Sequence, residues 1–250
     1  MSGHNKWSQI KHQKGITDAR RGQLFTKLAR EITISAKAGG GDPAANARLR
    51  LALQRAKDAS MPRENVDRAI KKATGGDGGS VDLAEVSYEG YTPGGAAIYI
   101  QAATDNRNRL ASEVRRIFTH NAGRMGESGT VAWLFENRGV ISAEAPDGKT
   151  DDITLAAIDA GADDVKQDGA DLEVFTTPNK LEAVRKVIEA AGAKVANAEL
   201  QMVPTTTSAL DAAHARATIR MIEQLEDLDD VQKVFSNADF PDAVLAEAAN

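Results

Sequence analysis

The feature that most constrains the fold of this chain is the stretch GGDGGS at residues 75–80, which divides the sequence into two unlike parts. Five of its six residues are glycine or serine, a composition typical of flexible linkers. Apolar residues before it recur with a helical period, whereas the segments after it alternate between strand and helix patterns. We therefore expect a small helical unit followed by a larger unit of mixed helices and sheets.

The first part of the chain contains three predicted amphipathic helices. In the first, Leu24, Leu28 and Ile32 recur at a spacing that places them on one face. The motif GGGDP at residues 39–43 ends this helix and supplies Asp42 as an N-cap for the next one. Three short helices of this kind form a small bundle when their apolar faces meet. The predicted helices span residues 18–38, 44–59 and 62–73.

Charge is distributed very unevenly between the two parts. The whole chain has a formal net charge of −5, from 31 Lys and Arg against 36 Asp and Glu. Residues 1–75 contain 16 Lys and Arg and 6 Asp and Glu, a balance of +10, so the rest of the chain carries −15. A segregated positive charge predicts an anion-binding surface in the first part of the chain.

The predicted phosphate-binding surface consists of the cations of the first part, with two histidines and a Trp that could stack on a base or cover the bundle. A solvated helix face with a charged tail is the alternative. The single sign of the charge and the acidity of the rest of the chain favour the phosphate contact. The candidates are His4, Lys6, Trp7, Lys11, His12, Lys14, Arg20, Arg21, Lys27, Arg30, Lys37, Arg48, Arg55, Arg68, Lys71 and Lys72.

The second part of the chain alternates between predicted strands and helices. VAWLF and GVISAEA are predicted as two strands separated by ENR, and Asp168-Gly169 as the turn of a later hairpin. Residues 130–204 therefore have the predicted order ββαββαβ, an α+β unit of ferredoxin type. The segments on either side are each too small to bury a sheet face, so we expect them to join.

These elements predict the fold class α+β: an N-terminal three-helix bundle followed by two ferredoxin-like α+β domains, one inserted in the other. The predicted domains are a basic helical domain at residues 1–78, a discontinuous α+β domain at residues 79–129 and 205–250, and an inserted ferredoxin-like domain at residues 130–204.

Two loops in the second part carry further candidates. EGYTPGG at residues 89–95 and DNRNR at residues 105–109 lie at strand ends, where functional loops often occur. The arginines could bind phosphate or a partner's carboxylate, or they could pair with nearby acids while Asp105 or Asn106 caps the next helix. The candidates for this second contact are Tyr91, Asn106, Arg107 and Arg109.

Several classes of function find no support in the sequence. Cysteine is absent, which removes disulfides, thiolate metal sites and cysteine nucleophiles. No apolar run approaches the ~20 residues of a membrane span, and the N-terminus lacks the apolar region of a secretory signal. Acidic pairs such as Asp151-Asp152 fall at helix ends and turns, where capping explains them better than a hydrolytic Mg²⁺ site. We expect a cytoplasmic protein that is not an enzyme, without metal, cofactor, membrane contact or small-molecule substrate.

Long motifs follow one another along essentially the whole chain: GHNKWSQIKHQKG, DARRGQLFTKLAREI, GGGDP, MPRENVDRAIKKATG, YEGYTPGG, TDNRNR, GTVAWLF, RGVIS and LEDLDDVQKVFSN. In this combination the sequence resembles the YebC family, whose members are labelled probable transcriptional regulatory proteins. A mitochondrial relative is a translational activator of cytochrome c oxidase. The resemblance implies a helical bundle with two α+β domains, one inserted in the other, and neither catalysis nor a cofactor.

The resemblance implies two kinds of target, because some members bind promoter DNA and others act on the ribosome and relieve stalling at proline-rich stretches. The basic surface lacks a recognition helix with Asn, Gln and Arg for base edges, which suits contacts to phosphates and shape. We expect a non-enzymatic nucleic-acid-binding regulator of gene expression, a DNA-binding transcriptional regulator by family label. The alternatives are a ribosome-associated translation factor that binds rRNA or tRNA, and a protein-interaction adaptor.

Overall fold

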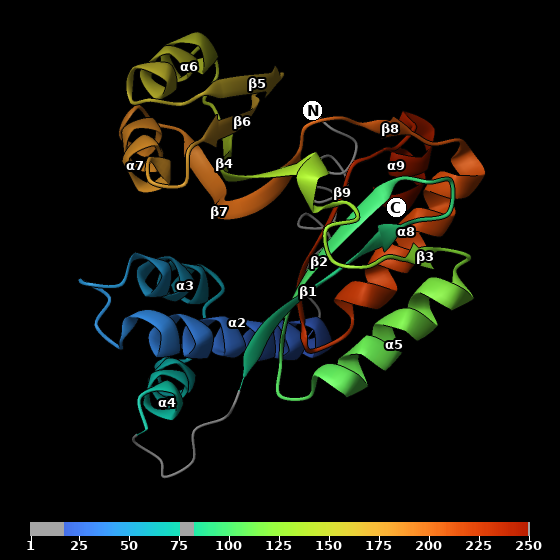
Figure 1. Ribbon diagram of the computed structural model, residues 1–250. Coiled ribbons are helices and arrows are strands. Elements are labelled where there is room, and N and C mark those ends of the chain that lie inside the picture. Colours follow the sequence, from blue (N-terminus) through green and yellow to red (C-terminus); the bar gives the residue numbers. More distant parts are fainter. Residues whose placement is uncertain (1–17, 76–82, 250) are drawn as a thin grey trace.

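The computed structural model describes residues 18–75 and 83–249 of the chain (Figure 1). Within these residues, helices at the N-terminal end precede two four-stranded sheets that each carry their own helices. The protein belongs to the α+β class, as the sequence predicts.

The N-terminal helices form a bundle around α2, which packs against α3 on one side and α4 on the other (Figure 1). Its core contains Leu28 and Ile32 of α2 and Leu49 of α3, all at the predicted helical spacing. The prediction that Asp42 caps the second helix is wrong. The side chain of Asn46 caps it instead by accepting a 3.0 Å hydrogen bond from the Leu49 amide. The three helices are α2 (Asp18–Gly39), α3 (Ala47–Asp58) and α4 (Arg63–Ala73).

The first sheet is antiparallel with the strand order β3-β1-β2-β9. Its strands come from both sides of residues 130–204, because β9 lies far beyond the others in the sequence. Helices α5 and α8 cover one face, and Ile98, Leu110 and Ile222 lie in the core between them. The elements are β1 (Ala84–Tyr91), β2 (Ala97–Thr104), α5 (Arg107–His120), β3 (Arg124–Met125), α8 (Ala212–Glu226) and β9 (Val231–Ser236), with the short β8 (Ser208–Ala209), β10 (Ala238–Asp239) and α9 (Asp242–Ala249) beside them.

The second sheet has the order β5-β6-β4-β7 and the chain order βαββαβ, which is the ferredoxin type. Ile141, Leu172 and Val184 lie in the core between this sheet and its two helices. The predicted hairpin turn at Gly169 is present, with a positive φ of 62°. The elements are β4 (Phe135–Glu144), α6 (Thr150–Asp159), β5 (Asp164–Asp168), β6 (Asp171–Thr176), α7 (Leu181–Ala190) and β7 (Lys194–Pro204).

The prediction of two strands at VAWLF and GVISAEA is wrong. Ala132–Leu134 forms a 3₁₀ turn, and a single strand continues from Phe135 through ENR to Glu144. The buried carboxylate of Glu89 accounts for the turn, because it accepts hydrogen bonds of 2.7–2.8 Å from the backbone amides of Gly129, Val131 and Ala132. Amides bound in this way are not available to a neighbouring strand.

The ferredoxin strand order holds for the second sheet and not for the first, whose chain order places β1 and β2 next to each other as a hairpin. The domain boundaries at residues 78, 129 and 204 stay a prediction. Among the described residues, none of the helices combines the length and apolarity needed to cross a membrane.

Candidate nucleic-acid interface

The predicted contact residues fall into three groups in the structure. The first group lies outside the described residues: His4, Lys6, Trp7, Lys11, His12 and Lys14. Arg20 lies in the first turn of α2. The other cations of the bundle divide between an outward face and an inward face, and the two faces have very different electrostatic surroundings.

The outward group is centred on α4. Arg68, Lys71 and Lys72 are exposed and lie three and four residues apart, so their side chains share one face of the helix. None of the three has an ion-pair partner among the residues that the structure describes. Arg21 and Lys37 of α2 are exposed as well. These residues have the exposure that a phosphate contact requires.

The inward group consists of Lys27, Arg30, Arg48 and Arg55, which face the two sheets. Lys27 donates to the backbone carbonyl of Glu226 at the end of α8, and Arg30 pairs with Asp230 just before β9. These four residues are predicted above as phosphate ligands, but the structure gives each of them a partner elsewhere in the chain.

Asp230 is the meeting point of the bundle and the first sheet. Its side chain is 6% exposed and accepts hydrogen bonds from Arg30, from Arg109 at 2.6 Å and from Thr104 at 2.7 Å. Burial by itself would raise the pKa of this carboxyl, but the hydrogen bonds from Thr104 and Arg109 and the charge of Arg30 outweigh it and lower the pKa. Asp230 is therefore held ionised between two cations from different parts of the fold.

Glu199 of β7 is likewise a buried carboxylate between two cations, at the contact between the second sheet and the bundle. Its carboxylate lies 2.6 Å from the Lys233 ammonium and 3.4 Å from the Arg55 guanidinium, which also contacts Glu31 at 2.5 Å. Burial opposes ionisation of Glu199, but the charges of Lys233 and Arg55 prevail and lower its pKa well below the ordinary value. Arg48 pairs with Glu85 in a bidentate contact nearer the surface, where both side chains are about half exposed.

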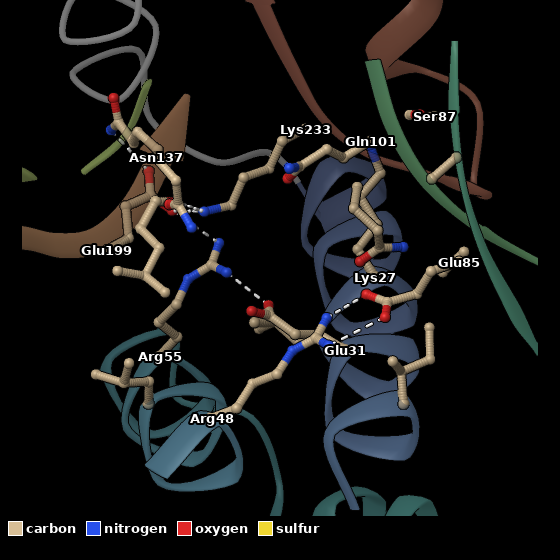
Figure 2. Close-up of a pocket in the computed structure, with 18 of the residues that line it drawn as sticks. Lys27, Glu31, Arg48, Arg55, Glu85, Ser87, Gln101, Asn137, Glu199 and Lys233 are labelled. Carbon is tan, nitrogen blue, oxygen red and sulfur yellow. Dashed lines mark hydrogen bonds and ion pairs between the residues drawn. The ribbon is translucent and has the colours of Figure 1, made fainter. Parts of the chain in front are cut away.

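The ion pairs of Glu199 and Glu85, but not those of Asp230, line a cavity of about 560 Å³ between the bundle and the two sheets. Figure 2 shows Lys27 and Glu31 of α2, Arg55 of α3 and Lys233 of β9 around it. Glu199 reaches it from the second sheet. The cavity is therefore the place where the three main parts of the fold come together.

The second predicted contact, at residues 91 and 105–109, is largely structural. Asn106 caps α5 by accepting a 3.0 Å hydrogen bond from the Arg109 amide, and Arg109 pairs with Asp105 and Asp230. The guanidinium of Arg124 lies over the ring of Tyr91, 5.4 Å from the ring centroid, in a cation–π contact. Arg107 differs from the others, because it is exposed and has no acidic partner among the described residues.

Sequence reasoning missed the polar residues of the two sheets that face the cavity, above all Gln101, Glu199, Gln232 and Lys233. The alternation of residues along β2 is a signal that could have found them. Ile98, Ile100 and Ala102 point to the face that packs against α5 and α8, so the polar Gln101 between them must point to the opposite face. In the described part of the chain, no three His, Asp or Glu side chains gather to hold a metal ion.

Comparison with known proteins agrees with this architecture. The TACO1/YebC N-terminal domain matches residues 5–76, and the TACO1/YebC second and third domain matches residues 83–238. The chain belongs to the TACO1/YebC family. The family resemblance noted in the sequence is thereby confirmed.

Similar proteins span nearly the whole chain. A probable transcriptional regulatory protein of Trichlorobacter lovleyi is 52% identical over 239 residues, 96% of each chain. One of Rubrobacter xylanophilus is 49% identical over 249 residues, covering 100% of both chains. The crystal structure of a conserved hypothetical protein from Aquifex aeolicus has a TM-score of 0.81 and 42% identity, covering 90% of this chain and 92% of that one. The relatives from Trichlorobacter and Rubrobacter are thus named as probable transcriptional regulatory proteins.

Proposed function

We propose that this chain is a cytoplasmic, non-enzymatic nucleic-acid-binding regulator of gene expression, and that the outward face of α4 contacts phosphates. The observation that carries the proposal is the cluster Arg68, Lys71 and Lys72, three exposed cations on one helix face without an acidic partner in the described residues. Such cations bind a polyanion by displacing its condensed counterions. The names of the relatives support the regulatory role.

The inward cations are not part of this proposed contact. Lys27, Arg30, Arg48 and Arg55 already interact with a carbonyl or with carboxylates, so a phosphate would have to displace those partners. The proposal therefore assigns binding to fewer residues than the sequence suggests, and it assigns cohesion between the parts of the fold to the others.

The decisive experiment reverses the charge of the outward cluster. The variant Arg68→Glu/Lys71→Glu/Lys72→Glu should lose most of its affinity for a 20-base-pair DNA duplex and for an RNA hairpin. If the cluster neutralises three phosphates, wild-type affinity should also fall by about 40-fold between 50 and 200 mM salt. The control variant Lys149→Glu/Lys186→Glu/Lys194→Glu makes the same change in net charge on exposed residues of the second-sheet region. Equal losses in both variants would refute the proposal.

The target class follows from two further measurements on the wild-type protein. The relatives' names give a role in transcriptional regulation. If this chain fills that role by binding promoters, it should prefer one DNA sequence over scrambled competitors. A translation factor should co-sediment with ribosomal subunits and lose this property in the outward-cluster variant. The adaptor would be favoured if the chain shows neither sequence preference nor co-sedimentation, but binds an unrelated protein and keeps that binding after nuclease treatment.

A further inference from the structure

The cavity between the bundle and the two sheets has properties that the proposed phosphate contact does not use. Its volume of about 560 Å³ lies in the range of small-molecule sites, about 300–1,000 Å³. Its wall combines charged, neutral polar and aromatic side chains from α2, α3, β1, β2, β7 and β9. These groups differ in how far other side chains already engage them.

The charged groups of the cavity are already matched. Lys233 and Arg55 share Glu199, and Arg48 is paired with Glu85. A charged ligand would have to separate one of these pairs and leave a carboxylate or a cation without its partner. The cavity is therefore poorly suited to an isolated anion or cation.

Some of the neutral polar groups, in contrast, are not engaged, although the Gln201 amide donates a hydrogen bond to Glu199. Ser87, Gln101 and Lys233 lie side by side in one row across β1, β2 and β9, because the strand register pairs Ser87 with Gln101 and Gln101 with Lys233. The side chains of Ser87 and Gln101 make no hydrogen bond to another described residue. Both line the cavity and are labelled in Figure 2.

Gln232 adds a second free amide. The register between β2 and β9 shifts after Gln101, so Gln232 is the extra residue of a β-bulge beside Lys233. Bulges redirect side chains and are frequent next to binding sites. The Gln232 side-chain nitrogen is buried without a hydrogen-bond partner in the described residues, although the residue lines the cavity. An unpaired donor at this position is stabilised by a ligand that accepts its hydrogen bond.

The cavity is also lined by one aromatic side chain, that of Tyr99. Tyr99 lines the cavity one pleat away from Gln101, and its ring is held against Phe135 with 6.0 Å between the ring centroids. Two amides, a hydroxyl and a fixed ring match a flat ligand that carries both donors and acceptors on its edge. Nucleobases have this chemistry: Asn and Gln bind their edges with paired hydrogen bonds, and aromatic side chains stack on their faces.

We propose that this cavity binds a single nucleobase through the amides of Gln101 and Gln232 and the ring of Tyr99. The inference rests on the proposed nucleic-acid binding, and it adds a recognition element for an unpaired base. The base belongs to a free nucleotide or to an unpaired residue of a nucleic acid.

The test uses full-length protein and two hairpins of identical charge, one with a single-nucleotide bulge and the other with an abasic residue at the bulge. Each of the four bases is placed in the bulge in turn. Wild type should bind at least one bulged base about 10-fold more tightly than the abasic hairpin. Gln101→Met/Gln232→Met should abolish this preference and leave affinity for the abasic hairpin unchanged. Gln167→Met, which changes an exposed amide on β5, should retain it.

A second variant, Ser87→Phe, places a bulky ring beside Gln101 and should abolish the preference without removing either amide. It covers the case in which the double variant does not fold. The outward-cluster variant of α4 should weaken binding of both hairpins equally, so loss of the proposed function is distinguishable from loss of base recognition.

AMP, CMP, GMP and UMP serve as free competitors, and displacement of the bulged hairpin by one of them would identify a free nucleotide as a ligand. Equal binding of bulged and abasic hairpins for all four bases, with no effect of any mononucleotide, would overturn the inference.

Discussion

The inward and outward cations of the helical bundle are made of the same residue types but differ in what surrounds them. Arg30 and Arg55 reach carboxylates that lie more than 100 residues away in the sequence, Asp230 and Glu199. Lys71 and Lys72 are exposed on α4 and have no acidic partner among the described residues. The comparison shows that net charge along a sequence overstates the charge available to a partner. In this molecule part of the +10 balance holds the fold together.

The largest expected effect is at Asp230. Asp230→Ala removes the carboxylate that Arg30, Arg109 and Thr104 share, and breaking a buried ion pair on one side costs about 4 kcal/mol. We expect this loss in the free energy of unfolding, measured with urea. The neighbouring Asp229→Ala changes an exposed carboxylate and should cost no more than about 0.5 kcal/mol. Similar losses at both positions would mean that Asp230 does not hold the two parts together.

The next effect is at Glu199. Glu199→Gln keeps the size of the side chain but leaves Arg55 and Lys233 without their shared charge, which should cost about 3 kcal/mol. Replacing both Glu199 and Lys233 by apolar residues, Glu199→Leu/Lys233→Met, should recover much of that loss, because Arg55 keeps its ion pair with Glu31 and Lys233 is no longer a cation without a partner. Urea unfolding of the two variants side by side checks this, and a double variant less stable than Glu199→Gln would contradict the role assigned to the ion pairs.

Acid should weaken the same contacts. The pKa values of Glu199 and Asp230 are lowered in the folded protein, so below pH ~5 the unfolded chain binds more protons than the folded one. Stability from these groups is complete above their ordinary pKa values and declines as the pH falls toward the folded values. We expect a loss of about 2 kcal/mol in the free energy of unfolding between pH 7 and pH 3. Glu199→Gln should show a flatter pH profile than wild type, and parallel profiles would speak against this origin of the pH dependence.

The smallest expected effect separates surface charges from buried ones. Arg48→Ala breaks a half-exposed pair with Glu85 and should cost no more than about 1 kcal/mol, because water screens it. Lys71→Ala should change stability by less than about 0.5 kcal/mol. Thermal or urea unfolding of these variants measures the loss of stability at exposed cations. A loss of unfolding free energy at Lys71 as large as that at Asp230 would mean that outward and inward charges do not differ in their contribution to the fold.

The sequence predicts the local elements well and the long-range pairs poorly. The period of Leu24, Leu28 and Ile32 correctly indicates the α2 face that packs in the bundle, because helix amphipathicity is a local property. The 3₁₀ turn at Ala132–Leu134 is missed because Glu89, which accepts a hydrogen bond from the Ala132 amide, lies 43 residues earlier. The partners of Arg30 and Arg55 are missed for the same reason. Their helical positions predict a shared face but not what covers it.

The salt dependence of nucleic-acid binding tests the division between outward and inward cations most directly. The measurement is the slope of the logarithm of the association constant against the logarithm of salt concentration, for one DNA duplex and three proteins. Arg68→Gln/Lys71→Gln/Lys72→Gln should reduce the magnitude of the wild-type slope by about 2.7, the value for three phosphates, and Arg48→Gln should leave it unchanged. A slope that is unchanged in the triple variant but reduced by Arg48→Gln would contradict the account.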